Sequence, residues 1–244
     1  MTLTAEQVGA KAAAPCPELA ISVVCLDQTR IGSHVEALYG LGVTRLHVDL
    51  VEPAFGGGLG LPLETISDLR DACDLPIDVH IMLVDPAAAV REAAARGATT
   101  VTVHQRSLTG AADGTGAALR DAAARGTAVG LAVDPGETIS RALVHDLRPH
   151  RLTVMSVEPG GAGRPFRPET RATVAAASAL RDSGAIREIE VDGAMGPATA
   201  PGMTEAGADL LVLGSTVFPH RSPRLNRLAE LRTALAAQPR PYPA

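Results

Sequence analysis

The chain is poor in aromatic residues, lysine and cysteine, and these shortages remove whole classes of function. Aromatic residues make up 2% of the 244 residues and tryptophan is absent, so the core has to be built from Val, Leu, Ile and Ala. Lysine occurs once, as Lys11, which argues against any mechanism that needs a lysine amine, such as a Schiff base. A net charge of −5 offers no basic surface, and we expect no nucleic-acid partner.

The three cysteines show no spacing typical of a metal site or a disulfide framework. They are Cys16, Cys25 and Cys73, and this odd number without a Cys-x-x-Cys pair favours a reducing compartment. No apolar run approaches the roughly 20 residues of a membrane span. Glu6 and Lys11 interrupt the Ala-rich start, unlike the apolar block of a signal peptide. We therefore expect a cytoplasmic protein without membrane contact.

From residue 19 onward, short β-type runs alternate with longer helical patterns. The predicted strands are 20–25, 43–49, 76–82, 99–103, 127–133, 151–157, 187–191 and 209–213. The predicted helices are 30–40, 63–72, 86–96, 113–125, 138–145, 168–183, 197–206 and 222–236. Several of these helices are followed by a glycine, as is common at helix ends.

Eight strand–helix units predict an α/β fold, a single (β/α)₈ TIM barrel, because such a barrel typically needs about 250 residues. We expect a flexible N-terminal arm over 1–18, the catalytic barrel over 19–237 and a Pro-rich tail over 238–244. An open doubly wound sheet is the alternative, but no Gly-x-Gly-x-x-Gly motif opens the first helix.

Two histidines and two aspartates lie at or near the ends of predicted strands. His47 and Asp49 are two residues apart in LHVD, so their side chains point to the same face of a strand. His80 lies in IDVHIM, and Asp192 ends IEVD. Two imidazoles and two carboxylates brought together would make a divalent-metal site. Asp78 also points inward, and we predict a buried hydrogen-bond partner there rather than a ligand.

Seven short motifs resemble one known family in their order along the chain. They are ISVVCLD (21–27), HVD (47–49), IDVHIM (77–82), VDPG (133–136), MSVEPG (155–160), EVDG (190–193) and LGSTVF (213–218). Over roughly residues 20–220 the chain resembles ribulose-phosphate 3-epimerase, a metal-dependent (β/α)₈ enzyme. Any single motif would carry no weight, whereas seven in the family's order make a chance match very improbable.

The resemblance implies an isomerase that inverts C3 of a ketose phosphate, with D-ribulose 5-phosphate to D-xylulose 5-phosphate as the first guess. It makes His47, Asp49, His80 and Asp192 the ligands of one divalent metal ion, and the sequence leaves Zn, Fe(II), Mn and Co open. Asp49 and Asp192 also match two acids on opposite faces of the substrate. One removes the C3 proton to leave a cis-enediolate, and the other returns a proton to the opposite face.

The resemblance also implies a set of substrate-binding residues. Ser22 and His80 match substrate contacts, and Met82 and Met155 match an apolar cap over the reacting carbons. Phosphate binding is expected from glycine-containing loops after the sixth, seventh and eighth strands. The residues of those loops are Gly160, Gly161, Ala162, Gly163, Gly193, Ala194, Gly214 and Ser215. His104, at the end of the fourth strand, is interpreted as a loop or packing residue.

Three segments depart from the family pattern and keep other functions open. HVDLVEP replaces HVDVMDG, FGGGLG replaces FVPNLT, and PGGAGR replaces PGFGGQ. The last change introduces Arg164, a possible phosphate contact. The alternatives are the same reaction on another phosphosugar, such as a hexulose 6-phosphate, or a sugar-phosphate-binding relative without turnover. The family often forms oligomers, so the resemblance makes a homo-oligomer possible.

Overall fold

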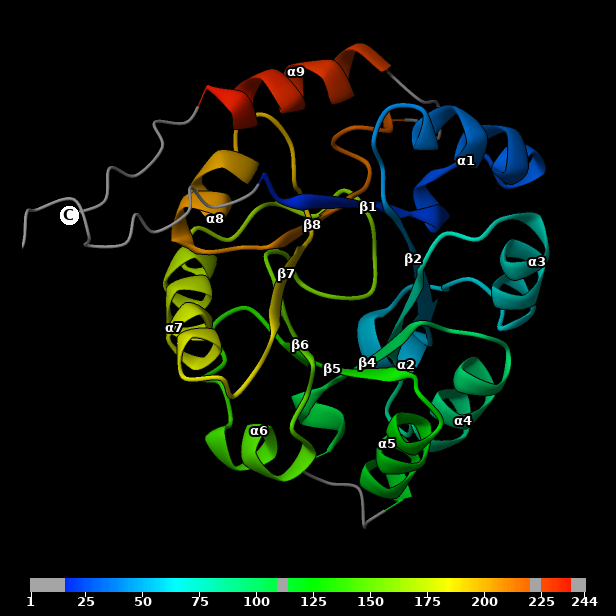
Figure 1. Ribbon diagram of the computed structural model, residues 1–244, viewed down its shortest axis with the longest axis vertical. Coiled ribbons are helices and arrows are strands. Elements are labelled where there is room, and N and C mark those ends of the chain that lie inside the picture. Colours follow the sequence, from blue (N-terminus) through cyan, green and yellow to red (C-terminus); the bar gives the residue numbers. More distant parts are fainter. Residues whose placement is uncertain (1–15, 109–113, 220–224, 238–244) are drawn as a thin grey trace, which may run out of the picture.

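The structure, a computed structural model, describes residues 16–108, 114–219 and 225–237 (Figure 1). It confirms the (β/α)₈ barrel. Eight parallel strands follow one another around the barrel in sequence order, and β8 pairs with β1 to close it. The strands are β1 Glu18–Ser22, β2 Arg45–Val51, β3 Ile77–Met82, β4 Thr100–His104, β5 Ala128–Val133, β6 Arg151–Met155, β7 Glu188–Asp192 and β8 Leu210–Leu213.

Apart from the short α2, the helices form an outer ring around these strands (Figure 1). They are α1 Ile31–Tyr39, α2 Pro53–Gly56, α3 Glu64–Ala72, α4 Ala87–Ala95, α5 Gly114–Ala124, α6 Arg141–Leu147, α7 Thr170–Asp182, α8 Ala200–Ala206 and α9 Leu225–Ala236. The described residues also include the 3₁₀ turns η1 Val23–Cys25, η2 Gln28–Arg30 and η3 Gln105–Ser107. Within the described residues, no helix is long and apolar enough to cross a membrane.

Each predicted strand and helix overlaps one in the structure, with two local differences. The first strand ends at Ser22, and Val23–Cys25 forms the turn η1 instead of continuing the strand. The short helix α2 was not predicted; it begins at Pro53, where the fixed φ of proline favours a helix start, and ends before Gly57 at φ +79°.

Several predicted segments lie partly or wholly outside the described residues. These are residue 113 of the fourth predicted helix, 222–224 of the last predicted helix, 1–15 of the arm and the tail 238–244. β1 begins at Glu18, the last residue of the expected arm.

Both faces of each barrel strand are covered, and the two faces carry different chemistry. In β2, Val48 packs with Ile66 of α3 in an aliphatic cluster between the strands and the helices. The alternate residues His47 and Asp49 point to the barrel interior with the other site residues, because side chains alternate along a strand. The outward face therefore builds the core, and the inward face is free to carry polar groups.

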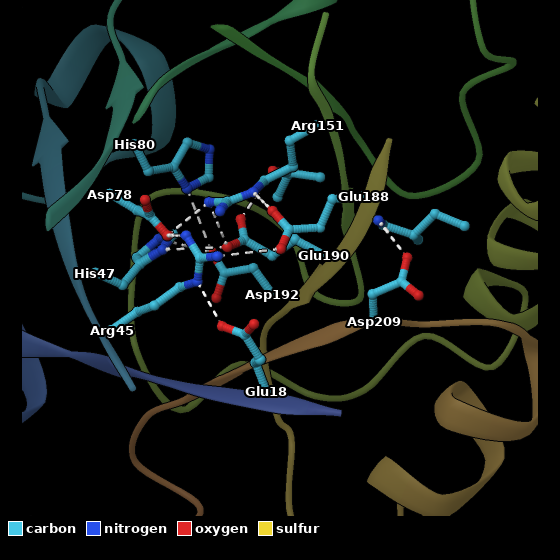
Figure 2. A network of polar contacts seen from close by, with 12 residues as sticks. Glu18, Arg45, His47, Asp78, His80, Arg151, Glu188, Glu190, Asp192 and Asp209 are labelled. Carbon is cyan, nitrogen blue, oxygen red and sulfur yellow. Dashed lines mark hydrogen bonds and ion pairs between the residues drawn. The ribbon is translucent and has the colours of Figure 1, made fainter. Parts of the chain in front are cut away.

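A layer of buried charge fills the barrel interior beneath these residues (Figure 2). Arg151 is fully buried, and its guanidinium lies 2.7 Å from Asp78, 3.1 Å from Glu190 and 2.6 Å from Glu188. This contact confirms that Asp78 is a buried hydrogen-bond partner. Burial alone would lower the pKa of Arg151, but the surrounding carboxylates raise it. Since Glu190 Oε2 also lies 3.8 Å from His47 Nδ1, the layer is the floor of the polar site above it.

Candidate metal centre and active site

His47, Asp49, His80 and Asp192 meet at the carboxyl end of the barrel interior (Figure 2 labels three of them). His47 Nε2 lies 3.2 Å from Asp49 Oδ1 and 3.6 Å from Asp192 Oδ2. His80 Nδ1 lies 3.7 Å from the same Asp49 oxygen and 3.3 Å from the same Asp192 oxygen. One ligand atom from each of the four residues therefore lies within 4.8 Å of all the others.

The four residues come from three strands, β2, β3 and β7. Asp49 is directly opposite His80 in the β2–β3 register, and Asp192 ends β7 beside Met155 of β6. Because β2 and β7 lie on different sides of a closed barrel, only closure brings their aspartates together. The two carboxylates therefore approach the shared centre from different directions.

The ring nitrogens that face this centre are left without hydrogen bonds. His47 Nε2 and His80 Nδ1 are buried, and neither has a hydrogen-bond partner among the described residues. Buried polar atoms are nearly always paired, so such orphans in native structures call for an ion or water. Two imidazole nitrogens and two carboxylate oxygens converging on one point fit a divalent cation.

The four groups also shift each other's proton affinity. Burial alone would lower the pKa of His47, but the charges of Asp49 and Asp192 raise it well above its usual value. For Asp192, burial favours the neutral acid, but the neighbouring His47 and His80 hold its pKa well below its usual range. Without a cation, the cluster thus keeps a proton on His47 between two carboxylates.

Metal binding is expected to displace this proton. Because a ligating imidazole must be neutral, we expect release of about one proton per metal ion at pH 7. Because the pKa of His47 is raised, metal affinity should increase with pH. It should rise by about tenfold per pH unit up to that pKa and level off above it. Titration calorimetry in buffers of different ionisation enthalpy measures the number of protons released per metal ion. Binding without proton release would contradict a raised pKa of His47 in the metal-free protein.

A cavity of about 350 Å³ opens above the cluster at the mouth of the barrel. Asp49 and Asp192 line it, whereas His47 and His80 are buried beneath. Every other substrate-binding residue predicted from the sequence also lines it: Ser22, Met82, Met155, Gly160, Gly161, Ala162, Gly163, Arg164, Gly193, Ala194, Gly214 and Ser215. All of the predicted substrate-binding residues except His80 thus belong to the wall of one cavity.

Ser22 connects the first strand to one of the two acids. Its hydroxyl donates a 2.8 Å hydrogen bond to Asp49 Oδ2, while Asp49 Oδ1 faces the histidines. The two oxygens of this carboxylate therefore have separate partners, and the hydroxyl fixes the plane in which Asp49 lies. Turn η1 follows directly and places Cys25 in the cavity wall, where burial raises the pKa of its thiol to about 11.

The departures from the family pattern in FGGGLG and PGGAGR lie against each other. The backbones of Gly56 and Gly160 approach so closely that a Cβ on Gly56 would lie 2.6 Å from the Cα of Gly160. A Cβ on Gly58 would overlap the carbonyl oxygen of Gly160. The additional glycines thus allow the loop after β2 to pack directly on the loop after β6.

Arg164 holds these two loops together. Its guanidinium donates a 2.8 Å hydrogen bond to the carbonyl of Pro159 and a 2.7 Å hydrogen bond to the carbonyl of Gly56. It also lines the cavity, so a positive charge lies at the cavity wall. A contact with the substrate phosphate stays a prediction.

Replacing Arg164 by alanine is expected to raise KM by about tenfold with a smaller change in kcat, because a charge-assisted hydrogen bond contributes about 1.5–3 kcal/mol. Loss of the positive charge, and loss of the hydrogen bonds that join the two loops, would both weaken binding of the phosphate group of the substrate. Steady-state kinetics at low and high ionic strength measure the effect, with exposed Arg171 of α7 replaced as the control. An unchanged KM would remove Arg164 from the binding site.

His104 is a residue that the interpretation of the sequence missed. It is fully buried, and its Nε2 lies 2.8 Å from Nε2 of His80. Its Nδ1 lies 2.6 Å from Oδ1 of Asp134. Burial lowers the pKa of His104 to about 4, despite the opposing effect of Asp134, so the ring is neutral at pH 7. The signal was the alternation in VTVH, which directs His104 to the interior face as the last residue of β4.

The fold and the site together define a (β/α)₈ enzyme with a site for a divalent cation at the mouth of its barrel. The model of the ribulose-phosphate 3-epimerase family matches residues 18–218, and the chain belongs to this family. The predicted resemblance is therefore confirmed, together with the isomerase class and the C3 epimerase activity of the family. Members of this family use a divalent metal, which agrees with the four-residue cluster.

Similar proteins agree with this assignment. Ribulose-phosphate 3-epimerase of Mycobacterium tuberculosis is 34% identical over 224 residues, which cover 91% of this chain and 94% of the relative. The cytoplasmic isoform of Oryza sativa is 31% identical over 215 residues, 87% of this chain and 92% of the relative.

Solved structures of more distant proteins share the fold. KGPDC from Streptococcus mutans, solved as a complex, has a TM-score of 0.65 at 14% identity, covering 91% of this chain and 98% of that chain. A 3-hexulose-6-phosphate synthase has a TM-score of 0.63 at 19% identity, covering 89% and 99%. At this identity the likeness shows the barrel alone.

Proposed function

We propose that this chain interconverts D-ribulose 5-phosphate and D-xylulose 5-phosphate by inverting C3, with Asp49 and Asp192 as the two catalytic acids. The observation that carries the proposal is the placement of these two carboxylates. They belong to strands on different sides of the barrel, face the same pair of histidines, and both line the cavity. Inversion requires a proton to leave one face of C3 and another to arrive at the opposite face, which a single group on one face cannot do.

The residues around the two acids support proton transfer. Ser22 fixes the orientation of Asp49, so one carboxylate oxygen remains directed at the centre of the site. The pKa of Asp192 is held low by the histidines, so the group is ionised, which is the form that a general base must have. Which acid serves as the base depends on the direction of the reaction, since the two exchange roles for the two epimers.

The four-residue cluster supplies the charge stabilisation that the reaction needs. A divalent cation held by His47, His80, Asp49 and Asp192 acts as a Lewis acid for the negative charge that develops on the substrate oxygens. Met82 and Met155, both almost fully buried, line the cavity beside the acids and exclude water from the reacting carbons.

The glycine-containing loops form the part of the cavity that we assign to the phosphate. Gly193 and Ala194 both have positive φ, +108° and +50°, so the chain turns sharply where it leaves β7. A Cβ on Gly193 would lie within 3 Å of Val157, so the loop after β7 lies tightly against the loop after β6. Turns of this kind present backbone N–H groups to an anion, and Gly214 and Ser215 extend the same wall.

Four further expectations complete the proposal. We propose a cytoplasmic protein, because the cysteines Cys25 and Cys73 are free in the structure. The acidic net charge supports the absence of a nucleic-acid partner. A homo-oligomer follows from the family resemblance alone. One catalytic domain over 19–237 agrees with the closed barrel.

A panel of ketose phosphates tests the substrate. The metal-loaded protein is incubated with D-ribulose 5-phosphate and with ketohexose 6-phosphates, and products are identified by NMR. The proposal expects D-xylulose 5-phosphate to form with the highest kcat/KM of the panel. Higher kcat/KM on a hexulose 6-phosphate would assign the same reaction to a larger sugar. Tight binding of every sugar without turnover would make the chain a sugar-phosphate-binding protein.

A further inference from the structure

The two ring nitrogens of His80 face different surroundings. Nδ1 points to the carboxylates of Asp49 and Asp192, at 3.7 and 3.3 Å. Nε2 points away from them and lies 2.8 Å from Nε2 of His104. The planes of the His80 and His104 rings differ by 8°, and the ring centroids lie 4.9 Å apart. His80 therefore lies between the metal site and His104, with one ring nitrogen facing each.

The position of each proton in this chain of groups follows from the contacts. If Nδ1 of His80 gives its lone pair to a cation, the ring must carry its proton on Nε2. That proton can only be directed at Nε2 of His104, which must then be an acceptor, with its own proton on Nδ1. Asp134 Oδ1 lies 2.6 Å from this Nδ1, so the negative charge of the carboxylate favours the proton there. One arrangement thus satisfies every group from Asp134 to the cation.

Asp134 is itself held in place from two sides. Arg106 Nε lies 3.1 Å from its second oxygen, Oδ2. Its backbone N–H donates a 3.0 Å hydrogen bond to the side chain of Glu137. Phe55 of α2 lies edge-on to the His104 ring at 4.8 Å between centroids, and the Arg106 guanidinium stacks on Phe55 at 3.7 Å. The carboxylate and the ring are therefore fixed before any ligand arrives.

We propose that His104, oriented by Asp134, is a positioning residue of the metal centre that fixes the tautomer and the ring orientation of His80. Partners of this kind hold a ligating histidine in its metal-binding form and make it a better donor. His104 lies behind His80 and does not line the cavity, so it acts on the centre through His80. The inference rests on the proposed function, because it assumes that His80 is a metal ligand.

The test compares zinc affinity in variants that keep or remove the acceptor. In His104→Phe an aromatic ring is kept but the acceptor is lost, whereas His104→Gln places an amide oxygen near the same position. Asp134→Asn keeps the shape of the acid but sets an N–H against either His104 or Arg106. His145→Phe, on the exposed surface of α6, is the control. Dissociation constants are measured by chelator competition, and the melting temperature of each metal-free variant is recorded separately.

We expect His104→Phe to raise the zinc dissociation constant about 10- to 100-fold, His104→Gln to raise it less, and the control to match the wild type. Asp134→Asn should also weaken zinc binding. If the role of His104 is purely structural, the melting temperatures fall while the zinc affinities of the folded variants stay at the wild-type value. That result would overturn the proposal. If His104→Phe does not fold, the other two variants decide. Wild-type zinc affinity in both His104→Gln and Asp134→Asn would then overturn the proposal. A wild-type protein that binds no zinc would overturn the metal centre itself, and this inference with it.

Discussion

Replacing Asp192 by asparagine is expected to lower kcat by about 10⁴-fold, the upper end of what a positioned acid or base contributes. The change removes the proton-transfer group on one face of C3 and also a carboxylate ligand of the proposed metal centre. Asparagine is nearly the same size, so the strand that carries it should be undisturbed. Since Asp49 is proposed to perform the matching step on the other face, Asp49→Asn should be affected to a similar degree.

Steady-state kinetics at saturating metal separate these two losses, because added metal compensates for weaker binding but not for a missing acid. Asp146→Asn provides a control, since this aspartate is exposed on α6, away from the cavity. A variant Asp192→Asn that retains kcat within tenfold of the wild type would exclude Asp192 as a catalytic acid.

Removal of the metal is expected to lower kcat on the order of 10³-fold, because a Lewis acid contributes several kcal/mol to such a reaction. A proton next to a ketone is too weakly acidic for a carboxylate to remove without stabilisation of the resulting charge. In this chain no lysine can take over that role, since Lys11 is the only one and precedes the barrel.

The experiment is dialysis against a chelator, measurement of residual metal, and then addition of Zn, Fe(II), Mn or Co one at a time. Restored activity identifies which cations the four ligands accept. Full activity in a protein shown to be free of metal would contradict the proposed role of the cluster.

Most of the fold could be predicted because its signals are local. In β2 the alternation of Leu46, Val48 and Leu50 with His47 and Asp49 indicates a strand with two different faces. The exceptions are segments too short to have a period. Turn η1 has the same apolar composition as a strand, and α2 is only four residues long. Pro53 could have indicated the start of α2, but nothing nearby fixes its length.

The four clustered residues were predictable from strand ends and motif order, whereas their surroundings required the three-dimensional structure. The contact between His80 and His104 depends on the positions of β3 and β4 in the closed barrel, and neither residue identifies the other in the sequence. The same holds for Arg151, whose buried charge is balanced by Asp78, 73 residues away. The close packing of Gly56 on Gly160 likewise gives the glycine substitutions in FGGGLG a physical reason that lies in a distant loop.

Solvent-deuterium exchange is the most direct test of two-sided proton transfer at C3. D-Ribulose 5-phosphate is incubated in D₂O with the metal-loaded protein and with a chelator-treated control, and C3 is followed by NMR. We expect deuterium at C3 of the D-xylulose 5-phosphate that forms, and no exchange in the control. Formation of D-xylulose 5-phosphate with the original proton retained at C3, or no exchange at C3 in protein that holds its metal, would contradict two-sided proton transfer.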